Sequence, residues 1–262
     1  MKIAIYGTGK MGRAIEEVAV KRGHTVGLKV NAANAGAPPT GMDLAIEFSK
    51  PDQALANMQL CLESGVPVVV GTTGWYEQLS EVKAMVERTN GTLLWASNFS
   101  IGVNLFFRVN RYLAQLMDHQ PGYAVHMDEV HHVHKLDAPS GTAITLARDI
   151  DLNTQRYSGW KLNEHLQTDQ PAPAPAPAPA PVPAPAPVPA SAPAPAPVRI
   201  NSERIGEVPG KHSVTWTSAE DKITITHDAF GRMGFATGAV VAAEWLKGKH
   251  GLFTMDDVLN MH

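Results

Sequence analysis

Residues 2–15 read KIAIYGTGKMGRAI. A short apolar run leads into Gly7, Gly9 and Gly12, after which apolar side chains recur at helical spacing. This order of strand, G-x-G-x-x-G turn and helix is typical of a βα unit that binds a dinucleotide. The glycines permit a tight turn, a close approach of pyrophosphate to the backbone, and close packing of helix on strand, while the helix start offers free N–H groups. The alternative is a tight turn that binds no ligand.

The alternation of strand and helix continues to about residue 100. Strands are predicted at 24–30, 42–48, 66–70 and 92–99, and helices at 51–65 and 76–89. This rhythm predicts a doubly wound, mostly parallel sheet of the Rossmann type, which binds ligands outside the carboxyl ends of its strands. The predicted cofactor-binding residues therefore lie in the glycine turn and at strand ends: Gly7, Thr8, Gly9, Lys10, Met11, Gly12, Lys29, Asn31, Gly71, Thr72, Thr73, Ala96, Ser97, Asn98 and Phe99.

The end of the second strand bears on the choice of cofactor. It reads LKVNAANAG (28–36), with Lys29 and Asn31 but no acid. An acid at this place usually binds the ribose of NADH, and its absence leaves room for the extra phosphate of NADPH. We therefore predict NADPH or NADH as the cofactor, with NADPH favoured.

The pattern changes near residue 101, where a strongly apolar helix (101–117) begins. Long alternating stretches follow at 122–133, 212–219 and 221–229, and they predict an open mixed sheet with one wet face. An apolar helix (235–251) and a short helix (253–261) close the chain and could return to the first domain. We predict an α/β fold with a dinucleotide-binding domain (1–101 plus 234–262) and an α+β domain for substrate binding and oligomerisation (102–233).

Residues 171–197 are a low-complexity tract in which proline alternates mostly with alanine or valine. Proline has no N–H group and fixes φ, so we expect neither helix nor sheet here but solvated polyproline II. We interpret the tract as an expanded surface loop. The alternative is a ligand for an aromatic groove, but the flanking basic residues that such ligands often carry are missing.

Composition narrows the class of partner. The net charge of −3 and the pI of about 6.4 give no reason to expect a nucleic acid or an anionic membrane surface. The single cysteine, Cys61, excludes an internal disulfide framework and fits a reducing compartment. No stretch resembles a signal peptide or a membrane span. We expect a cytoplasmic protein whose partner is a small molecule.

The stretch EVHHVHKLDAPSGT (129–142) concentrates three histidines, acids and a lysine. Neighbouring side chains of a strand point to opposite faces, so His131 and His132 should diverge. His132 and His134 could share a face, but the only cysteine is remote in sequence, and we predict no metal. A polar strand on a wet sheet face would account for the histidines but not for the residues that follow them.

Those following residues predict a helix start. Ser140 is expected to be the N-cap, with Gly141 and Thr142 opening the helix and offering unpaired N–H groups to a carboxylate. Lys135 lies five residues before Ser140. A lysine and a histidine beside a helix start predict a pocket that binds an anion and donates protons.

The motif E-x-H-H-x-x-K-x-D-A-P-S-G-T-A resembles the signature of the dihydrodipicolinate reductase (4-hydroxy-tetrahydrodipicolinate reductase) family of lysine biosynthesis. The segments G-x-G-K-M-G, DLAIEFSKPD, VVVGTTGW, ASNFSIGVN and GRMGFATGAVVAAEWL are similar to the family in the same order. The resemblance covers nearly the whole chain except 151–200. The glycine turn is one residue shorter than the family's common form, Asn31 stands where an acid is frequent, and the proline-alanine tract has no counterpart.

The resemblance implies NAD(P)H-dependent reduction of 4-hydroxy-tetrahydrodipicolinate (dihydrodipicolinate), a cyclic dicarboxylate, to tetrahydrodipicolinate in the diaminopimelate pathway, by a homotetramer. It implies His131 as proton donor and acceptor, Lys135 as proton donor, and His132, Gly141 and Thr142 as substrate-binding residues. We add Ser140 to the carboxylate seat, and Arg232 as a partner for the second carboxylate. The alternatives are a related NAD(P)H-dependent reductase of another substrate and a non-catalytic nucleotide-sensing module.

Overall fold

The computed structural model describes residues 1–168 and 195–260. The chain divides into two compact units, one made of Met1–Asn104 and Arg232–His262 and the other of Leu105–Gly231. The expected domain boundaries, after residues 101 and 233, lie close to these divisions. The greater part of the proline-alanine tract, up to residue 194, lies outside the described residues.

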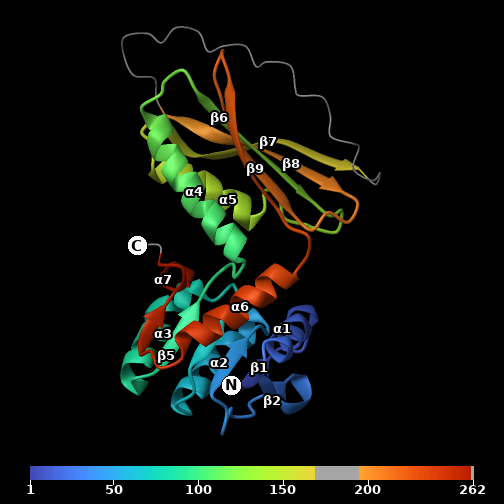
Figure 1. Ribbon diagram of the computed structural model, residues 1–262, viewed down its shortest axis with the longest axis vertical. Helices are drawn as coiled ribbons and strands as arrows, with labels where there is room; N and C mark the ends of the chain where they lie inside the picture. Colours follow the sequence, from blue (N-terminus) through green and yellow to red (C-terminus); the bar gives the residue numbers. More distant parts are fainter. Residues whose placement is uncertain (169–194, 261–262) are drawn as a thin grey trace. The chain divides into compact units, whose positions relative to one another are not determined.

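The first unit contains a sheet of six parallel strands in the order β11-β5-β4-β3-β1-β2 (Figure 1). The strands are β1 (Lys2–Tyr6), β2 (Thr25–Val30), β3 (Leu44–Glu47), β4 (Val68–Val70), β5 (Thr92–Trp95) and β11 (Gly251–Phe253). The predicted doubly wound parallel sheet is confirmed. β11 was not expected, because three residues are too few to show a period.

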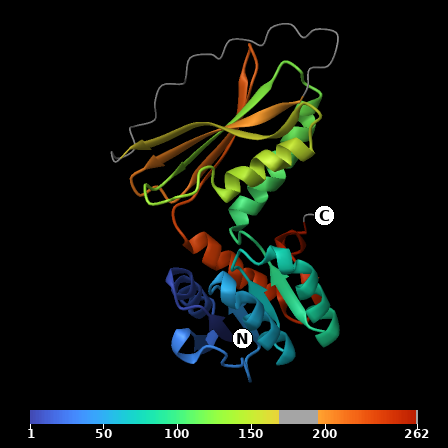
Figure 2. The same cartoon turned by 180° about the vertical axis from the view of Figure 1, so that it is seen from behind.

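Helices cover both faces of this sheet (Figure 2). On one side lie α1 (Lys10–Lys21), α6 (Met233–Leu246) and α7 (Met255–Val258), and on the other α2 (Pro51–Glu63) and α3 (Leu79–Thr89). Short 3-10 turns, η1 (Ala32–Asn34) and η2 (Tyr76–Gln78), complete the connections. Successive residues of each strand serve opposite cores: Ile3 and Ile5 face α1 and α6, whereas Ala4 and Tyr6 face α2 and α3.

The second unit contains a five-stranded mixed sheet in the order β10-β9-β6-β8-β7. Its strands are β6 (Ala124–His131), β7 (Tyr157–Thr168), β8 (Ala196–Ile205), β9 (Lys211–Thr217) and β10 (Lys222–Asp228). β6, β9 and β10 pair antiparallel, while β7 and β8 pair parallel to each other and β8 parallel to β6. The predicted open mixed sheet is confirmed, although β7 and β8 were not foreseen.

The start of β8 corrects one expectation. We expected no residue of 171–197 to join a sheet, yet Ala196 and Pro197 belong to β8. Proline is tolerated there because the register between β7 and β8 shifts at this point, and the pairing of β8 with β6 begins only at Arg199.

Two helices, α4 (Ile101–Asp118) and α5 (Gly141–Leu152), lie side by side on one face of this sheet (Figures 1 and 2). Alternate side chains of β6 are therefore buried, and they include Glu129 and His131 at its end. Nowhere in the described ranges is there a helix long and apolar enough to span a membrane.

Candidate active site

The glycine turn of the first unit has the geometry of an anion-binding loop. Gly7 has a φ of +94°, and a Cβ there would lie 2.1 Å from the carbonyl oxygen of Phe48. A Cβ on Gly12 would lie 1.9 Å from the carbonyl oxygen of Gly7, whereas one on Gly9 would meet nothing within 4 Å. Gly9 is the N-cap of α1, without a side-chain cap or an acid in the first turn. The helix start thus keeps unpaired N–H groups beside open space, which suits a pyrophosphate.

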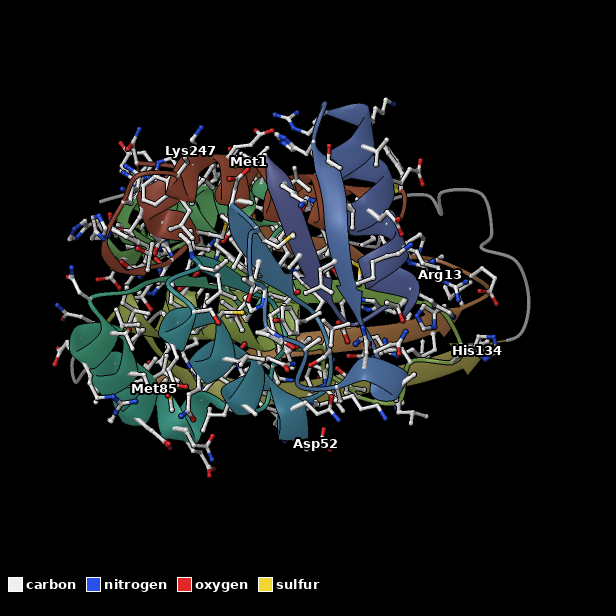
Figure 3. All side chains as sticks on the ribbon, turned by 90° about the horizontal axis from the view of Figure 1, so that it is seen from below. Met1, Arg13, Asp52, Met85, His134 and Lys247 are labelled. Carbon is white, nitrogen blue, oxygen red and sulfur yellow. The ribbon has the colours of Figure 1, made fainter. Side chains whose placement is uncertain are left out.

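A pocket of about 390 Å³ adjoins this turn, lined by Ile5, Thr8, Gly12, Arg13, Glu16, Lys29 and Asn31. Lys29 forms an ion pair with Glu16 (2.9 Å), and the Asn31 side chain accepts the Ala33 N–H (2.8 Å). Arg13 is carried by α1 (Figure 3), and its side chain has no hydrogen bond or ion pair among the residues that the structure describes. Arg13 was not predicted, although it directly follows the glycine motif.

The other predicted cofactor residues follow β4 and β5. Gly71, Thr72 and Thr73 come directly after β4, and residues 96–99 after β5. These strands are parallel to β1, so the residues reach the same edge of the sheet as the glycine turn. A Cβ on Gly71 would lie 2.1 Å from the ring of Phe48, so this glycine allows close packing there. The cofactor contacts of these residues stay predictions.

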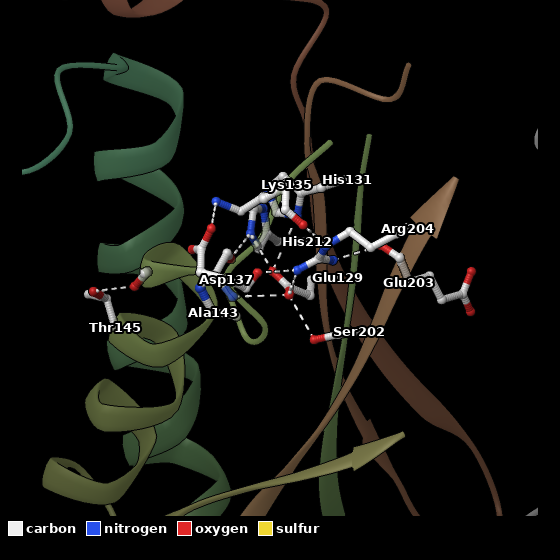
Figure 4. A network of polar contacts seen from close by, with 12 residues as sticks. Glu129, His131, Lys135, Asp137, Ala143, Thr145, Ser202, Glu203, Arg204 and His212 are labelled. Atoms are coloured by element: carbon white, nitrogen blue, oxygen red, sulfur yellow. Dashed lines mark hydrogen bonds and ion pairs between the residues drawn. The ribbon is translucent and has the colours of Figure 1, made fainter. Parts of the chain in front are cut away.

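In the second unit, a buried carboxylate lies at the centre of a polar network (Figure 4). One oxygen of Glu129, Oε1, accepts hydrogen bonds from the Ser140 N–H (3.0 Å), the Ser202 hydroxyl (2.7 Å) and the Arg204 guanidinium (3.1 Å). The other oxygen, Oε2, lies 3.3 Å from His131 Nδ1 and 3.6 Å from His212 Nε2. Strands β6, β8 and β9 and the start of α5 therefore meet at one carboxylate.

The surroundings keep Glu129 ionised. Burial alone would raise the pKa of Glu129, but the close imidazoles of His131 and His212 and the hydrogen bonds from Ser140 and Ser202 outweigh it and hold the pKa well below its usual range. Burial lowers the pKa of His212, which therefore favours its neutral form. The ionised carboxylate of Glu129 and the neutral imidazole of His212 thus lie next to each other, and both are adjacent to His131.

The predicted substrate-site residues of this unit fall around the network. The predicted divergence of the neighbouring histidines is confirmed, because the His131 ring packs against His212 (5.0 Å between centroids) and the His132 ring against His134 (6.0 Å). The Lys135 Nζ lies 2.7 Å from Asp137 Oδ1. His131 is the last residue of β6, and Lys135 lies in the loop that leads from β6 to α5.

The start of α5 has the predicted cap. The Ser140 hydroxyl accepts the Ala143 N–H (3.2 Å) and lies 3.0 Å from His212 Nε2. Within the part of the chain that the structure describes, the Gly141 and Thr142 N–H groups have no partner. The hydroxyl and N–H of Ser140 are already engaged, so the open N–H groups are those of the two residues after it. Substrate contacts of all three residues stay predictions.

Arg232 belongs to the first unit, where it is the exposed N-cap residue of α6. Its predicted contact with a substrate carboxylate stays a prediction. Ser202, Arg204 and His212 were missed as site residues. Ser202 and Arg204 lie in β8, which was not predicted, and His212 lies in β9. Nothing in the local sequence of β8 or β9 indicates that these strands lie next to Glu129.

Glu129, His131 and His212 also have potential ligand atoms within 4.8 Å of one another, close enough to share a cation. This set differs from the three neighbouring histidines considered from the sequence. The Arg204 guanidinium already neutralises the same carboxylate, and His212 Nε2 lies at hydrogen-bond distance from Ser140. We therefore interpret the cluster as a site that holds protons.

A glycine turn open to a pyrophosphate on a doubly wound sheet, with a histidine, a lysine and an open helix start in a second unit, defines a nicotinamide-dependent oxidoreductase. Family models described as dihydrodipicolinate reductase, N-terminus and C-terminus, match residues 23–99 and 102–259. The chain belongs to the dihydrodipicolinate reductase family. The glycine turn lies before both matched ranges, so its interpretation as a pyrophosphate site rests on its geometry alone.

Curated relatives agree with this assignment, and a solved structure has a similar fold. The chain is 40% identical to a 4-hydroxy-tetrahydrodipicolinate reductase of Christiangramia forsetii, over 99% of this chain and 98% of the relative. It is 31% identical to the enzyme of that name from Neisseria gonorrhoeae, over 100% and 98%. A dipicolinate-bound dihydrodipicolinate reductase from Paenisporosarcina shares the fold, with a TM-score of 0.70, 21% identity and 97% of both chains covered.

Proposed function

We propose that this protein reduces 4-hydroxy-tetrahydrodipicolinate to tetrahydrodipicolinate with NADPH or NADH, in the diaminopimelate route to lysine. The observation that carries the proposal is the loop from His131 to Thr142, which combines two proton-bearing side chains with an open helix start. The names of the full-length relatives support the same activity.

The 4-hydroxy substrate first loses water to give dihydrodipicolinate. The two carboxylates and the conjugated imine of dihydrodipicolinate define what the residues have to do. The Gly141 and Thr142 N–H groups, with His132, bind one carboxylate, and Arg232 binds the other. A bound reduced nicotinamide supplies a hydride to one carbon of the conjugated system. Negative charge then moves to the ring nitrogen, where the Lys135 ammonium stabilises it or donates a proton that it takes back when the neighbouring carbon is protonated. His131 supplies the proton that the neighbouring carbon requires.

The test uses purified protein with reduced cofactor and with substrate made in place by the preceding synthase reaction. We expect the absorbance of the reduced nicotinamide to fall, and 2,6-pyridinedicarboxylate to inhibit as a planar analogue of the substrate. Cofactor binding without turnover would favour a nucleotide-sensing module. Turnover of other carbonyl or imine substrates, but not of this one, would favour a related reductase.

For the cofactor we infer a preference for NADPH. The pocket beside the glycine turn contains the uncommitted guanidinium of Arg13 and a lysine, but its one acid, Glu16, is paired with that lysine. A guanidinium binds a phosphate through two parallel hydrogen bonds, so Arg13 suits the 2′-phosphate of NADPH. A lower KM for NADH than for NADPH would contradict this.

We also propose a cytoplasmic homotetramer whose copies meet through the open face of the second sheet. No described helix covers this face, and polar ladders such as Ser213–Thr226 (3.0 Å) and Asp128–Asn201 (2.8 Å) run across it. Light scattering should give four times the chain mass of 28.1 kDa. A mass of one chain at micromolar concentration would contradict the proposal.

A further inference from the structure

We propose that Glu129 positions His131 for proton donation, by holding the imidazole at Nδ1 so that Nε2 faces the substrate, and that Arg204 and His212 hold Glu129 in place. The proposal rests on the proposed function, in which His131 is the proton donor. Glu129 itself does not contact the substrate and acts only through His131.

The two carboxylate oxygens of Glu129 have separate tasks. Oε1 accepts all three hydrogen bonds from Ser140, Ser202 and Arg204, which fix the plane and direction of the carboxylate. Oε2 accepts none of these and faces the two imidazoles. Glu129 and Arg204 are each only 1% exposed, so the position of this anion is set by the protein and not by solvent.

Arg204 couples the carboxylate to the loop that carries Lys135. Besides Glu129 it donates to the carbonyl oxygens of Asp137 (2.5 Å) and Lys135 (3.3 Å). Both proposed proton donors therefore contact one buried ion pair. His131 contacts the Glu129 carboxylate, and the backbone of Lys135 accepts a hydrogen bond from the Arg204 guanidinium.

The geometry around His131 selects one tautomer. Its Nδ1 is buried, and Glu129 Oε2 lies 3.3 Å away, within ion-pair distance, so the negative charge of the carboxylate favours a proton on Nδ1. The Nε2 side faces Gly210, where a Cβ would lie 3.0 Å from Nε2. A side chain at position 210 would therefore crowd the reactive nitrogen, and glycine avoids this.

His212 lies on the other side of the same carboxylate. Its burial favours the neutral imidazole, so the charge of Glu129 remains available to a protonated His131. The other charged or titratable groups around this pair are Arg204 on β8, Lys135 and Asp137 in the loop, and His227 on β10 beside His212. In each turnover the proton leaves Nε2, the neutral ring keeps its Nδ1 proton against Glu129, and Nε2 takes a new proton from water.

The kinetic test compares Glu129→Gln and Glu129→Asp with a matched control, Glu207→Gln. Glu207 pairs with His134 at 3.1 Å, but both side chains are highly exposed. Glu129→Gln should lower kcat by about 10- to 100-fold with a nearly unchanged KM for the dicarboxylate. Glu129→Asp, which keeps the anion, should restore most of the lost kcat, and Glu207→Gln should behave as wild type.

A kcat as low in Glu129→Asp as in Glu129→Gln, or a large rise in KM in Glu129→Gln, would show a merely structural role and overturn the proposal, as would an unchanged kcat in Glu129→Gln. Tight zinc binding by active enzyme that is lost in Glu129→Gln would overturn it as well, in favour of a metal site.

A second measurement needs neither substrate nor a variant. Nitrogen-15 spectra of histidine-labelled wild-type protein should show His131 protonated at Nδ1 and unprotonated at Nε2 when neutral. The opposite tautomer would refute the positioning role. If this spectrum is found but the substrate is not reduced, the proposed function fails while the arrangement of Glu129 and His131 stands.

Discussion

Gly9 and Gly12 belong to one motif but differ in what a methyl group would meet. At Gly12 it would collide with the backbone of Gly7, so Gly12→Ala should lower the free energy of unfolding by about 1–3 kcal/mol. At Gly9 it would enter open space, so Gly9→Ala should fold normally yet raise the Kd for NADPH at least about tenfold. Urea unfolding and fluorescence titration measure the two effects. NADPH binding by Gly9→Ala at wild-type strength would show that the pyrophosphate does not bind at this helix start.

Arg13 offers a residue-level test of cofactor choice. Arg13→Ala should raise the KM for NADPH about 10- to 100-fold and leave the KM for NADH nearly unchanged, because a charged hydrogen bond to the 2′-phosphate contributes about 1.5–3 kcal/mol. Arg88→Ala, which removes an exposed arginine of α3, is the matched control. Equal changes for the two cofactors would mean that Arg13 does not distinguish them.

Residues close together in sequence could be predicted as a group. Lys135, Ser140 and Gly141 follow His131 within ten residues, so strand alternation and cap chemistry sufficed to predict an anion site with proton donors. The pairing of Arg204 with Glu129 could not be predicted in this way. It depends on the register of β6 with β8, which sets His131 opposite Arg204, and no local pattern contains that register.

At the scale of elements, strands buried on both faces and amphipathic helices were predictable, because their apolar periods are strong. β7 was missed because its sequence, YSGWKLNEHLQT, mixes polar and apolar residues without a clean alternation. β8 was missed because its first residues continue the proline-alanine pattern. The unexpected strands matter chemically, since β8 supplies both Ser202 and Arg204.

The network that joins three strands and α5 predicts how stability depends on pH. The pKa of Glu129 in the folded protein lies below its ordinary value of 4.5, so its contribution to stability is present above about pH 4.5 and is lost as pH falls further. The free energy of unfolding of wild type, measured in urea, should therefore fall steeply as the pH is lowered from about 5 to about 3. Glu129→Gln should be less stable at neutral pH, because it leaves Arg204 buried without its anion, and its acid dependence should be flatter.

The exposed pair of Glu207 and His134 again supplies the control. Glu207→Gln should unfold as wild type at every pH, since exposed ion pairs contribute little. If the free energy of unfolding falls equally with decreasing pH in wild type and in Glu129→Gln, the low pKa assigned to Glu129 is wrong.

At the scale of the whole molecule, the parallel pairing of β7 and β8 constrains their connection. A chain that joins the end of β7 to the start of β8 has to cover the length of a strand, about 40 Å for 12 residues. Shortening residues 169–194 to about 16 residues should therefore preserve stability and activity, whereas removing them entirely should prevent folding of the second unit. Circular dichroism and the reductase assay distinguish these outcomes. A full deletion that stays active would contradict the parallel pairing.

We propose that hydride transfer from a nicotinamide and proton transfer from His131 belong to one reaction. Mass analysis of the product formed from substrate and NADPH that carries deuterium at the transferable position tests both steps. We expect one deuterium in tetrahydrodipicolinate, formed by His131→Gln about 100-fold more slowly than by wild type. A product without deuterium, or equal rates in the two proteins, would contradict it.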